Sequence, residues 1–437
     1  MASTNKRIVA GIDIGTSKIT TIIASLPDEG PVRVSGVATS TARGVRKGQI
    51  VDIEEATTSI TESLEAAERM AGYSISSAYL SVGGAHVSSQ NSHGVVAVAE
   101  PNKEITPEDV RRAVEAARAI SLPATKEILH VIPREFIVDS QEGIKDPVGM
   151  TGVRLEVNTH LITVNSTVLR NLEKCASLVG IDVNGFVFGG LAASTSVLTE
   201  TEKELGVVVI DIGAGTVDLC IFVDGALSYS SVLPFGARNI TNDLAIGLKI
   251  SLESAEKIKM LLNKKSGELL SEEKPVLHVK KEKGKDPDDQ IDISSLTLPE
   301  GVNRISKRTL IDGIIRPRLT EMFTMIGIEI KKSGLLGMTP SGIVVTGGGA
   351  ETIGLVDAAR RNLAMQVRIG NPGFITGLID EITTPSYASV VGLVLYAQRV
   401  GAGNKEKFAG GQLGKLAHLP VGGIAGKVVD LFKSFLP

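Results

Sequence analysis

Two segments of the chain carry an aspartate and a glycine directly after a run of apolar residues. In the first, Asp13 follows residues 8–12, and in the second, Asp211 follows residues 207–210. Each run predicts a buried strand, and the glycines after it allow a tight turn whose backbone N–H groups converge on one anion. A carboxylate at such a strand end can hold a hydrated Mg²⁺ ion. Either segment alone is also an ordinary strand-to-turn signal, so the inference depends on the repetition.

The repetition predicts two similar domains that face each other across one nucleotide. The residues expected around the phosphates are glycines, small hydroxyl residues and one lysine. Next to Asp13 they are Gly15, Thr16, Ser17 and Lys18, and next to Asp211 they are Gly213, Gly215 and Thr216.

A third segment, residues 343–350, is expected to border the base and ribose. Its apolar strand runs into three consecutive glycines, Gly347, Gly348 and Gly349. Glycines at a strand end let the backbone come close to a flat ligand. Glu256 and Lys259 are three residues apart and share one face of a predicted helix. They either contact adenosine or form a solvated ion pair, and the residues alone leave both readings open.

The order and spacing of the three segments resemble the phosphate-1, phosphate-2 and adenosine motifs of the actin, Hsp70 and sugar-kinase ATPase superfamily. The resemblance implies an α/β protein with the actin-like (ribonuclease H-like) two-domain ATPase fold. It also implies ATP as ligand, with Mg²⁺ held through water near Asp13 and Asp211. Hsp70 and MreB contact adenosine with a Glu-x-x-Lys pair, which favours that role for Glu256 and Lys259.

Strand and helix signals surround these motifs. Residues 7–40 read as strands, and Asp52 with Glu55 predicts a capping box that opens a helix ending at Gly72. Residues 78–82 return to a strand pattern. Near the other end of the chain, one amphipathic helix is expected over 306–330 and a closing helix over 385–400.

Residues 84–163 interrupt the expected actin-like core. They contain a helix start at Thr106-Pro107 and strand patterns at 127–138 and 152–164. Their segments ITPEDV, EILHVIPREFIVD and GIKDPVGMTGVRLEVNTHLITV closely resemble the subdomain carried by the FtsA family of bacterial division proteins, and this likeness covers essentially the whole chain. PilM proteins of type IV pili have a related insertion.

The resemblance divides the chain into three core subdomains, an inserted subdomain, a linker and a last helix. The parts are 1–83 with 164–204 (subdomain 1A), 84–163 (inserted subdomain 1C), 205–241 with 306–400 (subdomain 2A), 242–305 (subdomain 2B), 401–420 (flexible linker) and 421–437 (amphipathic membrane-targeting helix).

The composition argues against several classes of function. With 437 residues the chain is long enough for two or more domains. A net charge of -3, an aromatic content of 3% and the absence of Trp argue against nucleic-acid binding. The two cysteines and six histidines lack metal-site spacing, which argues against zinc. Without a signal peptide or a bilayer-spanning apolar run, the protein is expected in the cytoplasm.

Gly189 and Gly190 stand near the place where actin and Hsp70 have a Gln or Glu that orients the attacking water. Phosphoryl transfer needs that water held in line. We therefore expect tight ATP binding with at most slow hydrolysis, and we assign no catalytic residue.

Residues 422–437 place apolar side chains at helical spacing. Five of them share one face: Ile424, Val428, Leu431, Phe432 and Phe435. The stretch is too short to span a bilayer, so it either docks on the protein's own core or lies in a lipid interface. The linker before it and the same ending in FtsA proteins favour the membrane.

The resemblance implies a filament-forming anchor that ties FtsZ to the cytoplasmic face of the membrane at the division site and helps assemble the division ring. Expected partners are the FtsZ C-terminal peptide (held within 242–305), further copies of the chain, membrane lipid and later division proteins. A PilM-like pilus scaffold is the main alternative. A sugar or acetate kinase would need a substrate-facing carboxylate or base, and an Hsp70-type chaperone would need a peptide-binding domain after the ATPase.

Overall fold

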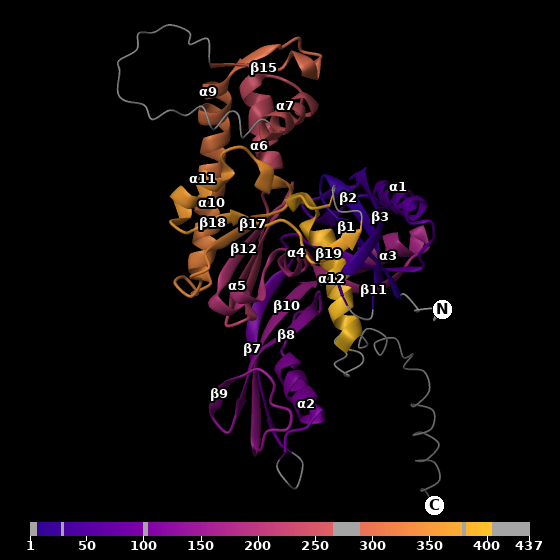
Figure 1. Ribbon diagram of the computed structural model, residues 1–437, viewed down its shortest axis with the longest axis vertical. Coiled ribbons are helices and arrows are strands. Elements are labelled where there is room, and N and C mark those ends of the chain that lie inside the picture. Colours follow the sequence, from indigo (N-terminus) through magenta and orange to yellow (C-terminus); the bar gives the residue numbers. More distant parts are fainter. Residues whose placement is uncertain (1–6, 28–29, 99–103, 265–288, 378–381, 404–437) are drawn as a thin grey trace, which may run out of the picture.

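The computed structural model describes residues 7–27, 30–98, 104–264, 289–377 and 382–403. In these ranges two large sheets form the centre of the molecule (Figure 1). The first has the order β11 (Asp182–Phe188), β6 (Ser77–Val82), β1 (Arg7–Ile14), β2 (Lys18–Leu26), β3 (Val32–Thr41) and β19 (Ile375–Gly377). The second has the order β14 (Ala226–Leu233), β13 (Val217–Val223), β12 (Val207–Ile212), β17 (Ile343–Thr346) and β18 (Val367–Ile369).

The two sheets share one topology. In each, three consecutive strands form an antiparallel meander, β1-β2-β3 in one and β12-β13-β14 in the other. Two parallel strands then extend each sheet from its first strand, β6 and β11 in one, β17 and β18 in the other. This confirms the prediction of two similar domains.

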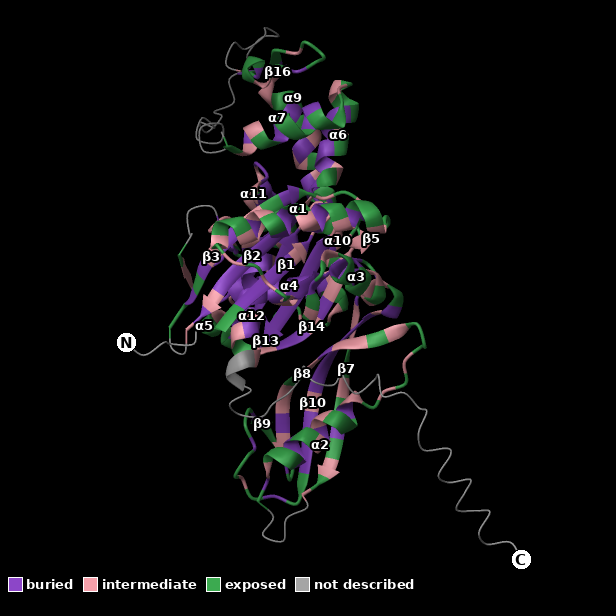
Figure 2. Cartoon of the chain, turned by 90° about the vertical axis from the view of Figure 1, so that its right-hand side faces the viewer, coloured by how far each residue is buried: buried purple, intermediate pink, exposed green. Residues whose placement is uncertain are grey.

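Helices cover both faces of the first sheet, whose central strands are buried (Figure 2). On one face lie α1 (Ile53–Ala71) and α3 (Ser166–Val179); on the other lie α4 (Gly189–Val197) and α12 (Ala388–Gly403). The predicted start of α1 is confirmed, because the Asp52 carboxylate accepts a hydrogen bond from the Glu55 N–H. Helix α4 also contacts β12 and β13, so it lies between the two sheets.

The insertion forms its own sheet below these two, in the order β7 (Ser88–Ala97), β10 (Arg154–Asn165), β8 (Lys126–Val138) and β9 (Gln141–Ile144) (Figure 1). Helix α2 (Pro107–Arg118) packs on it, and Thr106 forms a capping box with Asp109. The predicted helix start and both strands are confirmed.

At the opposite end lie α6 (Arg238–Leu248), α7 (Leu252–Lys264), β15 (Gln290–Asp292), η2 (Ser294–Leu296) and β16 (Arg304–Ser306). The helix predicted over 306–330 is confirmed as one uninterrupted helical run, but a π-helical turn within it was not predicted. The chain forms α9 (Lys307–Leu310), a π-helical turn η3 (Ile311–Ile315) and α10 (Arg316–Lys332). Pro317 explains the change, since it has no N–H for the carbonyl of Gly313 and its ring would press on that carbonyl in an α-helix.

Short elements complete the described fold. They are β4 (Val45–Arg46), β5 (Gln49–Ile50), α5 (Glu200–Leu205), η4 (Gly348–Glu351), α11 (Leu355–Leu363) and η5 (Pro385–Tyr387). Helix α12 runs to Gly403, three residues into the predicted linker. The rest of the linker and the predicted last helix, including its apolar face, lie outside the described residues. Among the helices described, none combines the length and apolar character needed to cross a membrane.

Candidate functional site

The two glycine turns have the same construction. At the end of β1 the Gly15 N–H donates to the Lys18 carbonyl at 3.1 Å, and at the end of β12 the Gly213 N–H donates to the Thr216 carbonyl at 2.9 Å. Each bond closes the hairpin to the next strand. A Cβ on Gly15 would lie 2.7 Å from the Lys18 carbonyl oxygen, so this turn requires glycine.

The turns meet between the two sheets. A Cβ on Gly215 would lie 2.9 Å from Thr16 Oγ1, and that hydroxyl accepts the Gly48 N–H at 3.1 Å. In the second turn the carbonyls of Gly213 and Ala214 accept N–H groups from the start of α6, both at 2.9 Å. Because these two carbonyl oxygens already accept hydrogen bonds, they do not repel an anion bound beside the turn.

Asp13 lies near the end of β1 and Asp211 near the end of β12, each just before its glycine turn. Ser389 Oγ donates to Asp211 Oδ2 at 2.8 Å. Burial raises the pKa of Asp211 to about 6, the Asp13 charge adds to the rise, and the Ser389 and Lys18 groups oppose it. Burial also raises the pKa of Asp13, against the Ser81 hydroxyl and the Lys18 ammonium. Because the charge of Asp13 raises the pKa of the buried Asp211 carboxyl, the pair forms a donor set that a divalent cation would stabilise.

Lys18 is the cation of this site. Its Nζ lies 4.1 Å from the ring centroid of Tyr387, a cation–π contact. Burial lowers the pKa of Lys18, while the carboxylates of Asp13, Glu351 and Asp211 raise it. Ser17, its neighbour in the turn, is exposed, and its carbonyl accepts the Ala42 N–H.

The three adenosine-motif glycines pack directly behind Asp211. Gly347 has φ +81°, and a Cβ there would lie 2.1 Å from Asp211 Oδ1. A Cβ on Gly349 would lie 2.4 Å from Ile212 Cγ2. At Gly348 the nearest atom would be Ser386 Cβ at 3.7 Å, so this position is less crowded. Two of the glycines are thus required by the fold itself, and their role toward a ligand stays a prediction.

Glu256 and Lys259 form the ion pair that the sequence allowed, with Lys259 Nζ 2.8 Å from Glu256 Oε2 and 2.9 Å from Thr241 Oγ1. The Lys259 side chain is buried and that of Glu256 is half exposed. Helix α7, which carries both, adjoins the glycine turn, because the Ile353 N–H donates to Asn263 Oδ1 at 3.2 Å. Their adenosine contact stays a prediction.

Sequence reasoning missed five side chains that surround the predicted ones. They are Ser81, Asp218, Glu351, Tyr387 and Ser389. Asp218 had a signal: it is the one charged residue in the otherwise apolar strand β13. Burial, followed by the charges of Asp211 and Asp13, raises the pKa of Asp218. In the ranges that the structure describes, no group of three or more His, Cys, Asp or Glu has the arrangement of a metal site.

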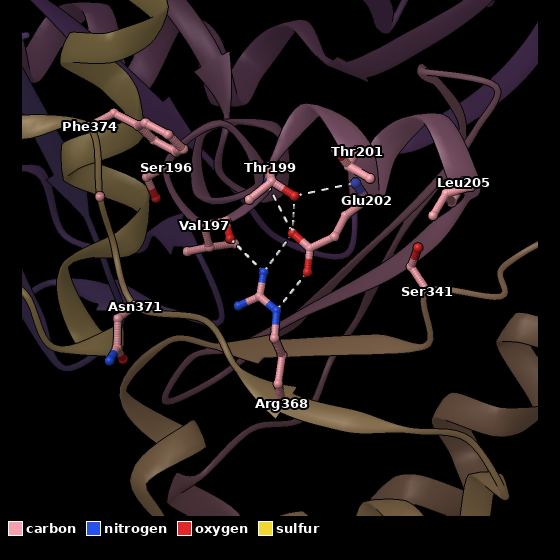
Figure 3. Close-up of a pocket in the computed structure, with 11 residues that line it drawn as sticks. Ser196, Val197, Thr199, Thr201, Glu202, Leu205, Ser341, Arg368, Asn371 and Phe374 are labelled. Atoms are coloured by element: carbon pink, nitrogen blue, oxygen red, sulfur yellow. Dashed lines mark hydrogen bonds and ion pairs between the residues drawn. The ribbon is translucent and has the colours of Figure 1, made fainter.

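A surface pocket of about 440 Å³ lies away from this site, and its lining does not include Asp13, Asp211 or Asp218 (Figure 3). The pocket is lined mainly by the segment that leads from the first sheet to the second, residues 196–205, and by the segment that returns to the first sheet, residues 368–374. Arg368 joins the two crossings: its Nε and Nη2 bind the Glu202 carboxylate at 2.7 and 2.8 Å, and Nη2 donates to the Val197 carbonyl at 2.9 Å.

Solved structures share this fold at low sequence identity. The "PilM-PilN type IV pilus biogenesis complex" matches with a TM-score of 0.62 and 15% identity, over 89% of this chain and 98% of that chain. MreB5 of Spiroplasma citri bound to AMPPNP matches with a TM-score of 0.51 and 13% identity, over 92% and 98%. Together with the paired sheets and turns, these likenesses define an actin-like ATPase fold.

Sequence comparison then gives the family. The model of the SHS2 domain inserted in FtsA matches residues 84–163, and the model of cell division protein FtsA matches residues 208–392. The FtsA proteins of Pseudomonas aeruginosa and Escherichia coli K12 are each 36% identical, over 89% and 91% of this chain and the same shares of their own lengths. That of Bacillus subtilis is 36% identical over 90% of this chain and 84% of its own. The chain belongs to the FtsA family of cell division proteins.

Proposed function

We propose that this chain binds Mg·ATP between its two glycine turns and hydrolyses it slowly at most. The observation that carries the proposal is the contact of Gly215 with Thr16, which brings the turns of both domains to one place. Lys18 and the free N–H groups of the turns would face the phosphates. The fold neighbour MreB5, solved with AMPPNP, supports a nucleotide as the ligand class.

The residues present fit a magnesium ion. Asp13 and Asp211 supply two carboxylates whose raised pKa values a dication would lower. A bound Mg²⁺ would neutralise charge on the phosphate oxygens. The chain's own contribution is to hold these carboxylates in place, with Ser81 bonded to one and Ser389 to the other.

In the cell, we propose, the protein anchors FtsZ to the cytoplasmic face of the membrane at the division site. Family membership supports this role, and residues 422–437 supply an apolar face in the sequence. Burying that face in lipid is worth on the order of a few kcal/mol after the helix is ordered. One copy therefore binds weakly, whereas copies held side by side on a filament bind firmly through effective concentration.

The FtsZ C-terminal peptide would bind within residues 242–305, and filament formation and the recruitment of later division proteins belong to the same proposal. A PilM-like pilus role is the weaker alternative. The likeness to PilM is one of fold at 15% identity, against 36% identity to FtsA proteins over most of the chain. A pilus scaffold would also have no need of the apolar face at 424–435.

Liposome pelleting with ATP tests the anchor. The full chain should pellet with vesicles, and a variant lacking residues 422–437 should stay in solution while it still binds ATP. Lipid binding that survives the deletion would contradict the tail assignment.

Co-pelleting with an FtsZ C-terminal peptide then separates the division role from the pilus role. The full chain should carry the peptide to the vesicle pellet. A pellet without peptide would contradict the FtsZ role.

A further inference from the structure

Within the described part of the chain, the Lys18 ammonium forms neither a hydrogen bond nor an ion pair and instead faces an aromatic ring. Its Nζ lies 4.1 Å from the centroid of the Tyr387 ring. The carboxylates of Asp13, Glu351 and Asp211 attract it only through space. A long side chain without a hydrogen bond keeps several rotamers unless another contact selects one. The ring supplies such a contact.

The face of the Tyr387 ring, rather than its hydroxyl, is the part that is used. No described residue forms a hydrogen bond with that hydroxyl. The ring is half-buried and packs against the apolar cluster between the first sheet and α12. Because this packing removes water from part of the ring, its attraction for a cation is stronger than at a fully exposed site.

The chain on both sides of the ring is bonded to the second domain. Before the ring, the Pro385 carbonyl accepts the N–H of Gly347, in the adenosine turn, at 3.1 Å. After the ring, Ser389 Oγ donates to Asp211 Oδ2 at 2.8 Å. Lys18, by contrast, begins β2 of the first sheet. The contact between lysine and ring therefore joins the phosphate turn of one domain to the adenosine turn of the other.

We propose that Tyr387 is the positioning residue of Lys18, and that its ring holds the ammonium between the two domains where the phosphates of ATP bind. Because the lysine is already ordered, less rotamer freedom is lost when the nucleotide binds. An ammonium carries several N–H donors and the ring covers one side of it, so donors remain for phosphate oxygens. Tyr387 acts through the lysine and does not itself touch the nucleotide. The proposal rests on the nucleotide site proposed above.

Tyr387→Leu tests this role, because it removes the aromatic face and keeps an apolar side chain against the same core. Tyr387→Phe is the matched control, since it keeps the face and loses only the unbonded hydroxyl. Lys18→Met gives a background in which the contact cannot form, and combining it with Tyr387→Leu completes a double-mutant cycle. The measurements, on the full chain with Mg²⁺, are the affinities for ATP and for adenosine.

Tyr387→Leu should weaken ATP binding roughly fivefold to thirtyfold, the range that a partly buried cation–π contact corresponds to. Tyr387→Phe should stay within about twofold of wild type. In the Lys18→Met background, Tyr387→Leu should change ATP affinity by less than about twofold. Adenosine has no phosphate for Lys18 to bind, so its affinity should be the same for wild type and every variant.

Equal ATP affinity in wild type and Tyr387→Leu would overturn the proposal. So would a loss of full size in the Lys18→Met background, because Tyr387 would then act without the lysine. A parallel loss of adenosine affinity would overturn it as well, since the ring would then only support the adenosine turn. A loss in Tyr387→Phe would assign the effect to the hydroxyl, with the same consequence.

A wild-type protein that binds no ATP would overturn the proposed function, and this role of Tyr387 with it. That outcome is distinct from the others, which all require measurable ATP binding by the wild type.

Discussion

Asp211 is the residue whose chemistry most clearly depends on its surroundings. Its carboxyl lies beneath Gly347, is bonded to Ser389, and faces the charge of Asp13. A carboxyl whose pKa rises on folding destabilises the folded state at pH values above its unfolded pKa, because the buried form must carry the charge. The nucleotide-free protein therefore bears a cost that a bound cation would offset.

Asp211→Asn should stabilise the nucleotide-free protein at pH 8. A folded pKa of about 6 against 3.8 corresponds to about 3 kcal/mol, and by pH 5 about half of this gain should be lost as the wild-type carboxyl takes up its proton. Urea unfolding at both pH values measures the difference. A gain that is absent, or that grows as the pH falls, would contradict the assigned burial.

Gly215→Ala should push the two turns apart. The new Cβ would lie 2.9 Å from both Oγ1 and Cγ2 of Thr16, a short side chain held by Gly48. ATP affinity should fall at least about tenfold, or roughly 1.4 kcal/mol, in a fluorescence titration. Gly313→Ala is the control, since its Cβ would meet nothing closer than 3.8 Å. Unchanged affinity in Gly215→Ala would place the nucleotide elsewhere.

At this scale the sequence was sufficient for Asp13 and Asp211, because an acid after an apolar run is a local signal. It was insufficient for Asp218. The Asp218 carboxyl accepts a hydrogen bond from the Gly190 N–H, which belongs to an element of the other domain, and no local sequence pattern connects the two residues. The crowding of Gly347 against Asp211 is likewise a tertiary contact, which three glycines in a row do not reveal.

At the scale of elements, the connections between the sheets determine how the domains are held. Arg368 on β18 ties that strand to the crossing at Val197 and Glu202. Arg399 near the end of α12 makes a looser pair with Glu200, at 3.4 Å. Arg368 therefore binds a carboxylate of α5 through two hydrogen bonds, whereas Arg399 binds another through one longer ion pair.

Arg368→Ala should lower the free energy of unfolding by about 1–2 kcal/mol, because two charge-assisted bonds and a bond to a carbonyl are lost from a half-exposed position. Arg399→Ala should change it by less than about 0.5 kcal/mol. Chemical denaturation of both variants makes the comparison. Equal losses would show that the bidentate geometry is unimportant.

Elements with strong local signals were predictable, including the caps of α1 and α2 and the meander of the first sheet. The π-helical turn η3 was not predicted, although Pro317 is visible in the sequence. The apolar period continues across it, and period alone does not separate an α-helix from a helix with a π turn.

At the scale of the whole molecule, the inserted subdomain docks on the second sheet through buried polar groups. His160 of β10 bonds Ser230 of β14 at 2.9 Å and Asn91 of β7 at 2.7 Å, and Ser89 donates to the Ser230 carbonyl at 2.6 Å. Burial, with the charge of Arg134, lowers the pKa of His160 to about 4. The histidine is therefore neutral near pH 7 and serves as a hydrogen-bonding group.

His160→Ala should loosen this contact, because it leaves the Ser230 and Asn91 side chains without a buried partner. Amide hydrogen exchange should rise in β7 and β14 and stay unchanged in α1. His93→Ala, an exposed position of the same subdomain, is the control. Unchanged exchange in β14 would mean that the subdomain is held by other contacts.

The overall architecture followed from the resemblance of three motifs and one insertion. The docking of that insertion did not, because it depends on side chains from β7, β10 and β14 that meet only in the folded chain.

A structure of the protein with Mg·ATP tests the central claim most directly. The account predicts the triphosphate beside the contact of Thr16 with Gly215, with the metal between Asp13 and Asp211. A nucleotide bound anywhere else, such as the pocket lined by Arg368 and Phe374, would contradict it.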